Sequence, residues 1–113
     1  MDFEKLSVWR RSKDLAVGVY QVFKECRDFG FKGQITRSAV SIPSNIAEGM
    51  ERLSWREKVW LLGVAKASCA ELRTQLIIAA EIGYLSAELA DKWINETRQL
   101  SRMLSGLINK ISN

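Results

Sequence analysis

The sequence predicts an all-α protein that folds as an antiparallel up-down-up-down four-helix bundle. Two observations favour this fold. Apolar residues recur at spacings of three and four in four successive segments, and no segment shows the alternation of a strand. One proline and seven glycines in 113 residues are too few for a sheet protein built from many turns. Residues 1–113 therefore form one predicted domain.

The first two helices are expected over Asp2–Arg27 and Gln34–Arg52. Between them, residues 28–33 read DFGFKG, and the two glycines in this stretch predict a loop. The inward-facing apolar residues of the first helix are predicted to be Leu6, Trp9, Ala16, Tyr20 and Phe23, and those of the second Ile35, Ala39, Ile42 and Ile46.

The third helix is predicted over Trp55–Ile82, and the fourth begins after Ser86. Ser54 and Glu57 form a capping box before the third helix, while Gly83 is a typical residue just beyond a helix end. Ser86 can cap the fourth helix. The predicted core stripes are Trp55, Val59, Leu62, Cys69, Leu72, Leu76 and Ala79 in the third helix, and Leu89, Trp93, Leu100, Leu104, Leu107 and Ile111 in the fourth.

A proline interrupts the pattern of the second helix, in the sequence RSAVSIPSNIAEG at residues 37–49. Pro43 has no N–H and its ring clashes with the carbonyl of Ala39, so it predicts a kink. A second stripe of the same helix is polar and consists of Gln34, Ser38, Ser41, Asn45 and Glu48. This stripe is either an ordinary solvated face or a seam that packs against another helix or subunit, with Asn45 and Glu48 hydrogen-bonded across it.

The third helix carries more apolar residues than one bundle stripe needs. Trp60, Leu61, Val64, Ile77 and Ile78 fall on other faces of the helix. The small residues Gly63, Ala67 and Ala70 would allow a close helix approach. Surplus apolar surface favours self-association, and the alternative is that these side chains are half-buried at the flanks of a monomer.

The composition argues against catalysis and against a metal or cofactor site. The chain has no histidine, and its two cysteines, Cys26 and Cys69, lie 43 residues apart. It has neither a Walker A loop nor a GxGxxG motif. The N-terminus lacks the apolar region of a signal peptide, and no apolar run reaches the ~20 residues of a membrane span. We expect a cytoplasmic protein that is not an enzyme and needs no cofactor.

Two long motifs resemble a known bacterial family. RSAVSIPSNIAEG at residues 37–49 and AKASCAELRTQLIIAAEIGYL at residues 65–85 resemble the four helix bundle proteins encoded in intervening sequences of 23S rRNA genes, also called S23 ribosomal proteins. The accessory variability determinant (Avd) of diversity-generating retroelements is a relative. The resemblance implies a ring-like homopentamer with the proline inside the second helix. Structural or interface positions that it implies are Arg37, Ser41, Pro43, Asn45, Glu48, Gly49, Glu71, Leu72 and Gln75.

Two functions stay open at this point. The first is a homo-oligomeric accessory protein that binds RNA or DNA. The formal charge of +4 would give about +20 in a pentamer, enough to attract phosphates. The basic residues expected to make the contacts are Arg10, Arg11, Lys13, Lys24, Arg98 and Arg102, unless they form an ordinary solvated face, since acidic residues are interleaved with them. The second function is a protein–protein scaffold, with Trp60 as a candidate contact. A reverse transcriptase is the partner expected of a retroelement accessory protein.

Overall fold

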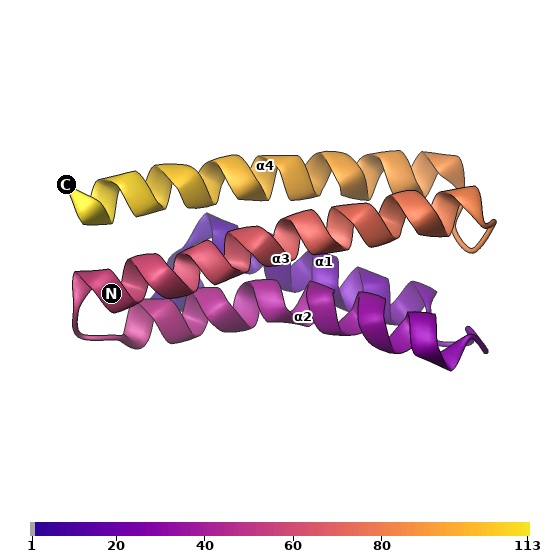
Figure 1. Cartoon of the computed structure of the whole chain (residues 1–113), viewed down its shortest axis with the longest axis horizontal. Coiled ribbons are helices and arrows are strands. Elements are labelled where there is room, and N and C mark those ends of the chain that lie inside the picture. The colour runs from indigo at the N-terminus through magenta and orange to yellow at the C-terminus, as the bar shows by residue number, and fades with distance from the viewer. Residues whose placement is uncertain (1) are drawn as a thin grey trace.

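Four antiparallel helices form a rod of 43 × 21 × 20 Å (Figure 1). The computed structural model describes residues 2–113. A short 3-10 turn, η1 (Phe3–Lys5), precedes helices α1 (Ser7–Val22), α2 (Phe29–Glu51), α3 (Trp55–Glu81) and α4 (Ala87–Ser112). Residues 2–113 contain no strand. The all-α fold with four helices is therefore confirmed.

Helix α1 is shorter than predicted at both ends. Asp2 caps η1, because its Oδ1 accepts the Glu4 N–H at 3.1 Å, and Leu6 is extended (φ −73°, ψ 128°), so η1 and α1 are separate elements. At its other end α1 stops at Val22, and the next residues turn toward α2. The predicted span to Arg27 was wrong because the chain needs these residues to reverse direction.

Helix α2 begins five residues before the predicted start. Asp28 acts as the N-cap, since its Oδ1 accepts the Phe31 N–H at 3.2 Å, and aspartate is among the residues preferred at this position. The glycines of the expected loop, Gly30 and Gly33, therefore lie in the first turns of the helix. Helix α2 continues through Pro43 to Glu51, so the proline lies inside the helix.

Both predicted ends of α3 and the predicted start of α4 are confirmed, the C-terminal end of α3 to within one residue. The Ser54 Oγ accepts the Glu57 N–H at 3.1 Å, and the Ser86 Oγ accepts the Leu89 N–H at 3.2 Å. Gly83 has a φ of +81° and directly follows the last turn of α3. A residue with a side chain would be strained in this conformation. Local capping chemistry thus determines three of these boundaries.

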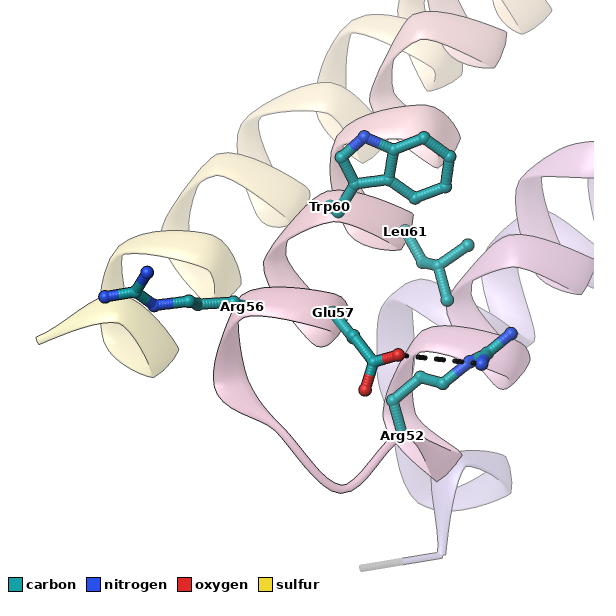
Figure 2. A pocket seen from close by; sticks show the side chains of 5 residues that line it. All are labelled: Arg52, Arg56, Glu57, Trp60 and Leu61. Atoms are coloured by element: carbon teal, nitrogen blue, oxygen red, sulfur yellow. Dashed lines mark ion pairs between the residues drawn. The ribbon is translucent and has the colours of Figure 1, made fainter.

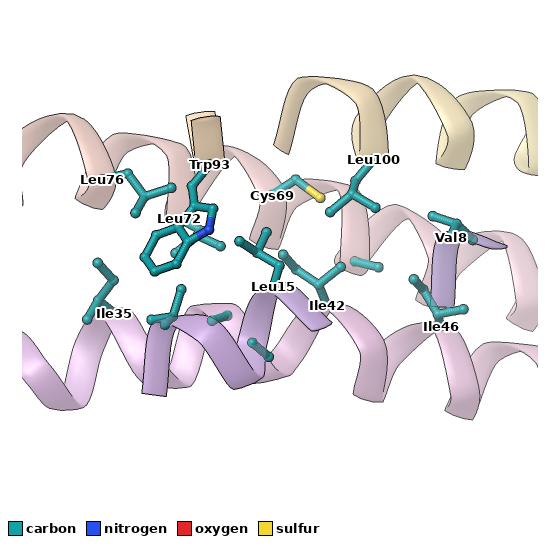
Figure 3. Close-up of a cluster of buried hydrophobic side chains, with 14 of the residues drawn as sticks. Val8, Leu15, Ile35, Ile42, Ile46, Cys69, Leu72, Leu76, Trp93 and Leu100 are labelled. Atoms are coloured by element: carbon teal, nitrogen blue, oxygen red, sulfur yellow. The ribbon is translucent and has the colours of Figure 1, made fainter. Parts of the chain in front are cut away.

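The core runs along the whole rod and draws on every helix (Figure 3). Ile35, Ile42 and Ile46 of α2 face Leu72 and other apolar residues of α3, and Leu100 and Leu104 of α4 complete the interior. Two predicted core residues, Tyr20 and Trp55, are instead about half exposed, and Leu61, predicted to lie outside, is buried. Each lies at the margin of its stripe, where periodicity cannot distinguish the two environments.

The helices do not pack equally against one another. Helix α3 packs extensively on both α2 and α4, whereas α1 packs mainly on α2 and touches α4 over a small area. At the contact of α1 with α4, Gly18 leaves room for Trp93, whose Cζ2 would lie 3.1 Å from an added Cβ. The α2–α3 and α3–α4 pairs therefore form the two long flanks of the molecule, on either side of α3.

Candidate functional site

The basic residues of α1 and of the turn after it that were predicted to contact nucleic acid are mostly engaged within the chain. The Arg10 Nη1 donates to the carbonyls of Lys5 at 2.7 Å and Glu4 at 3.3 Å, which closes η1 onto α1. Lys13 pairs with the neighbouring Asp14 at 2.7 Å. Lys24 is exposed and forms no ion pair with any residue of the range 2–113.

Arg11 joins α1 to α4. Its guanidinium donates to both carboxylate oxygens of Glu96, with the Nε–Oε2 distance at 3.0 Å, and to the Gln99 Oε1 at 2.6 Å. The hydrogen bond to Glu96 raises the pKa of Arg11, and the charge of the carboxylate acts in the same direction. The positive charge of Arg11 is therefore balanced locally and serves the packing of α1 on α4.

The two predicted residues of α4, Arg98 and Arg102, lie on a different side of that helix. Both are exposed, and neither forms an ion pair within the described part of the chain. Consecutive helical residues are rotated by about 100°, so Arg98 lies about 200° from Glu96, the residue that faces α1. The structure therefore does not bring the six predicted residues together on one α1–α4 surface.

Two cations of α3 lie beside Arg98 and Arg102. The Arg73 Nε donates to the Thr97 Oγ1 at 3.0 Å, which aligns Arg73 with the residue before Arg98. Lys66 precedes Arg73 by seven residues and lies on the same side of α3. Because α3 and α4 are antiparallel and Arg73 lies level with Thr97, Lys66 lies within about one helical turn of the level of Arg102. We call Lys66, Arg73, Arg98 and Arg102 the basic strip.

The basic strip has few carboxylates near it. Residues 97–113 contain no aspartate or glutamate at all. On α3, Glu71 precedes Arg73 by two residues, so it is rotated by about 200° and belongs to the α2 side of the helix. The strip is thus more uniformly positive than the α1 surface, where Asp14 and Glu96 balance Lys13 and Arg11.

The implied interface positions gather mainly along the α2–α3 flank. Within this flank, Ser38 is buried and its Oγ donates to the Oε1 of Gln75, which is also buried. Gly49 brings α2 close to α3, since an added Cβ would lie 3.1 Å from the Leu61 Cβ. Of the implied positions, Arg37, Glu48 and Glu71 are exposed, Ser41 and Asn45 are half-buried, and Pro43 and Leu72 are buried.

The polar stripe of α2 bonds mostly to its own helix. The Ser41 Oγ donates to the Ser38 carbonyl at 2.8 Å, and the Asn45 Nδ2 donates to the Ser41 carbonyl at 2.7 Å. Glu48 pairs with Arg52 at 3.2 Å. Asn45 and Glu48 therefore do not bond across to another helix of this chain, and the alternative seam with another subunit stays a prediction. Side chains near a proline satisfy local carbonyls instead, and Ser38 makes the bond to α3.

A pocket of about 340 Å³ lies where the α2–α3 flank meets the connecting turn (Figure 2). Its lining includes Arg52, Glu57 and Trp60. The Arg52 guanidinium faces the Glu57 carboxylate at 3.8 Å, so these two charged groups of the pocket are paired. Trp60 is 68% exposed, which makes it the most exposed tryptophan of the chain. The pocket is thus an open hollow at this end of the flank, in which Trp60 and Leu61 lie beside charged side chains.

Among residues 2–113 the structure offers neither a cluster suited to metal binding nor an activated thiol at the buried Cys69. No group of three or more histidine, cysteine, aspartate and glutamate residues is placed to hold a metal ion in this range. Burial raises the pKa of the Cys69 thiol from 9.0 to about 12, so the thiol stays protonated at neutral pH. None of the described helices combines the length and the apolar character that crossing a membrane requires.

Sequence reasoning missed Lys66 and Arg73 of the basic strip and the bond between Ser38 and Gln75. The acid-free run from residue 97 to residue 113 can be counted in the sequence and marks the α4 part of the strip, but it gives no signal for Lys66 and Arg73. The pairing of Arg73 with Thr97 could not be found in the same way, because it depends on the register between α3 and α4.

Comparison with known proteins gives a consistent result. The model of the 23S rRNA-intervening sequence protein family matches residues 4–106. A crystal structure of a protein with unknown function from the S23 ribosomal protein family of Bacteroides thetaiotaomicron superposes with a TM-score of 0.83. It is 25% identical to this chain, and the superposition covers 89% of this chain and 97% of the other. No curated protein matches the sequence.

Proposed function

This chain belongs to the 23S rRNA-intervening sequence protein family, and from that premise we propose that it is a non-enzymatic, homo-oligomeric protein that binds RNA or DNA as an accessory factor. The observation that carries the nucleic-acid part is the basic strip. Its two residues on α4 are exposed and have no ion-pair partner among residues 2–113, and the C-terminal half of that helix has no carboxylate to offset them. Such a surface attracts phosphates.

Self-association is the second part of the proposal. Trp60 and Ile78 are exposed on α3, while Val17 and Tyr20 are exposed on α1, so apolar side chains are available on two different surfaces. A contact between two different surfaces is heterologous, and copies joined in this way close into a ring when the rotation allows it. The number five comes from the resemblance to the family.

The proline of α2 belongs to the same proposal. Pro43 cannot donate to the Ala39 carbonyl, and we infer that the resulting kink shapes the α2–α3 flank for contact with a second copy. The half-buried Ser41 and Asn45 support this inference, because an additional subunit would complete their burial.

A protein–protein scaffold remains the alternative function. The exposed Trp60 beside its pocket favours it, because large exposed aromatic side chains are typical anchors of protein interfaces. In either case the proposed setting is the bacterial cytoplasm, and a reverse transcriptase is the proposed partner if the gene serves a retroelement.

A titration with RNA separates the two functions. We expect the purified protein to shift a labelled RNA of about 20 nucleotides at micromolar concentration in about 50 mM salt, and to lose most of this affinity at about 200 mM, since electrostatic binding depends steeply on salt. Lack of any shift at the lower salt concentration would exclude the nucleic-acid function and leave the scaffold.

A further inference from the structure

We propose that the basic strip binds the phosphodiester backbone of double-helical nucleic acid without reading its base sequence. This inference rests on the proposed nucleic-acid function and adds the surface and the class of ligand. It also excludes Lys13 of α1 and Lys24 of the turn that follows α1 from the binding surface, although the sequence alone placed both on it with Arg98 and Arg102.

The strip has the form of a backbone-binding surface. Two of its cations lie on α3 and two on α4, and these helices run side by side (Figure 1). At a rise of about 1.5 Å per residue, Lys66 and Arg73 are separated by roughly 10 Å along the helix axis and Arg98 and Arg102 by roughly 6 Å. A length of roughly 10 Å corresponds to about three base-pair steps of a duplex. Phosphates of neighbouring nucleotides can therefore contact several cations at once.

Neutral hydrogen-bond donors lie among the cations. Ser101, Ser105 and Asn109 follow Arg98 at helical spacings of three, seven and eleven residues, so they share its side of α4. Hydroxyl and amide groups at such positions bind phosphate and sugar oxygens in protein–nucleic acid complexes. Together with the arginines they form a surface that suits a sugar–phosphate backbone.

The absence of aromatic residues points to a duplex instead of a single strand. Proteins that bind single strands stack unpaired bases on aromatic side chains. Residues 66–73 and 97–105, which surround the strip, contain no phenylalanine, tyrosine or tryptophan. Trp60 lies six residues before Lys66 and is rotated by about 120° from it, toward the α2 side of α3. Contacts at the strip are thus limited to the backbone, which a duplex exposes in a regular form.

The test compares two double variants that lose the same charge. The full-length protein, Arg98→Gln/Arg102→Gln and Lys13→Gln/Lys24→Gln are titrated by fluorescence anisotropy with two unrelated 20-base-pair RNA duplexes and with the corresponding single strands. We expect the α4 variant to bind both duplexes at least tenfold more weakly and the Lys13/Lys24 variant to stay within threefold of the unchanged protein. The slope of log K against log salt should decrease in magnitude by roughly 2 in the α4 variant, about 0.9 for each lost phosphate contact.

Several results would overturn the inference. If both variants bound the duplexes equally weakly, only the net charge of the protein would matter. Nucleic-acid binding would then be confirmed, but the basic strip would not be its site. Single strands bound as tightly as duplexes would refute the choice of ligand, and polyglutamate bound as tightly would show a general anion surface. A change in oligomer mass of the α4 variant would make the strip an assembly surface. If the unchanged protein binds neither nucleic acid at low salt, the proposed function itself fails.

Discussion

The environment of each charged side chain determines what it can do. Arg11 and Arg98 look alike in the sequence, yet Arg11 is held by Glu96 and Gln99, whereas Arg98 has no ion-pair partner among the described residues. Periodicity predicted that both lie outside the core, and this much is correct. It could not predict which arginine meets a carboxylate, because Glu96 reaches Arg11 from 85 positions away in the sequence.

At the same scale, Asp28 and Tyr84 connect the turns at one end of the bundle. The Tyr84 hydroxyl donates to the Asp28 Oδ2 at 2.8 Å, and Tyr84 also packs edge-on against Phe31. The hydrogen bond from Tyr84 lowers the pKa of Asp28 below its ordinary value, and the bond from the Phe31 N–H adds to this effect. The carboxylate therefore has two partners in the folded state that it lacks in the unfolded chain.

This contact predicts a loss of stability in acid. A carboxyl whose pKa is lower in the folded state stabilises the fold above its unfolded pKa, and this contribution disappears as the pH falls through the folded pKa. Tyr84→Phe removes the main cause of the shift. We expect the difference in Tm between the unchanged protein and Tyr84→Phe to be largest near pH 7 and to shrink from about pH 5 to about pH 3, measured by circular dichroism. A difference that stays constant over this range would show that Tyr84 acts only through its packing on Phe31.

At the scale of the helices, capping residues explain most of the agreement and most of the errors. Ser54, Ser86 and Gly83 have unambiguous cap signatures, and both ends of α3 and the start of α4 were predicted within a residue. The start of α2 was missed because two glycines suggested a loop, whereas Asp28 caps a helix that tolerates both of them. Propensity is a weak indicator wherever a single cap can offset it.

The contact between α2 and α3 leads to a prediction about two glycines. Glycine inside a helix costs roughly 0.5–1 kcal/mol relative to alanine. Gly106 of α4 has no described neighbour within 4 Å of an added Cβ, so we expect Gly106→Ala to raise the free energy of unfolding by about this amount. At Gly49 the added Cβ would meet the Leu61 Cβ at 3.1 Å and the Lys58 carbonyl at 3.4 Å, neither of which can move without shifting α3.

For Gly49→Ala we therefore expect a net loss of about 1–3 kcal/mol, because overpacking outweighs the gain in helix propensity. Urea denaturation of both variants, fitted with a common m-value, provides the measurement. The two glycines control for each other, since both lie inside helices and both receive the same methyl group. Stabilisation by both substitutions would show that α2 and α3 can separate at Gly49 without cost.

At the scale of the whole molecule, the sequence predicted the architecture but not the division of its surface. Surplus apolar residues on α3 indicated self-association, and the cations expected on the first and fourth helices indicated a basic surface. Only the packing shows that these features lie on opposite sides of α3, with Ile78 and Trp60 toward α2 and Arg73 toward α4. This separation would leave the basic strip accessible in an assembly formed through the α2–α3 flank.

Two adjacent isoleucines of α3 allow a matched test of that assembly. Ile77 and Ile78 are exposed to nearly the same extent, at 40% and 43%. Gln75 bonds to α2, and Ile78 lies three residues after it, on the same side of α3. Arg73 bonds to α4, and Ile77 lies four residues after it, on that other side. The two side chains therefore lie on different flanks.

One chain has a mass of 12.8 kDa. In light scattering we expect the unchanged protein to have the mass of a closed ring of five such chains, about 64 kDa.

Ile78→Glu places a charge in the proposed contact, where its desolvation is unfavourable. This variant should reduce the measured mass toward the 12.8 kDa of one chain, whereas Ile77→Glu should leave the mass of the assembly unchanged. Circular dichroism of both variants checks that the helices remain folded. A monomeric mass for the unchanged protein would refute self-association altogether. Dissociation by Ile77→Glu alone would move the interface to the α3–α4 flank, and the basic strip would then be covered in the assembly and unavailable to a duplex.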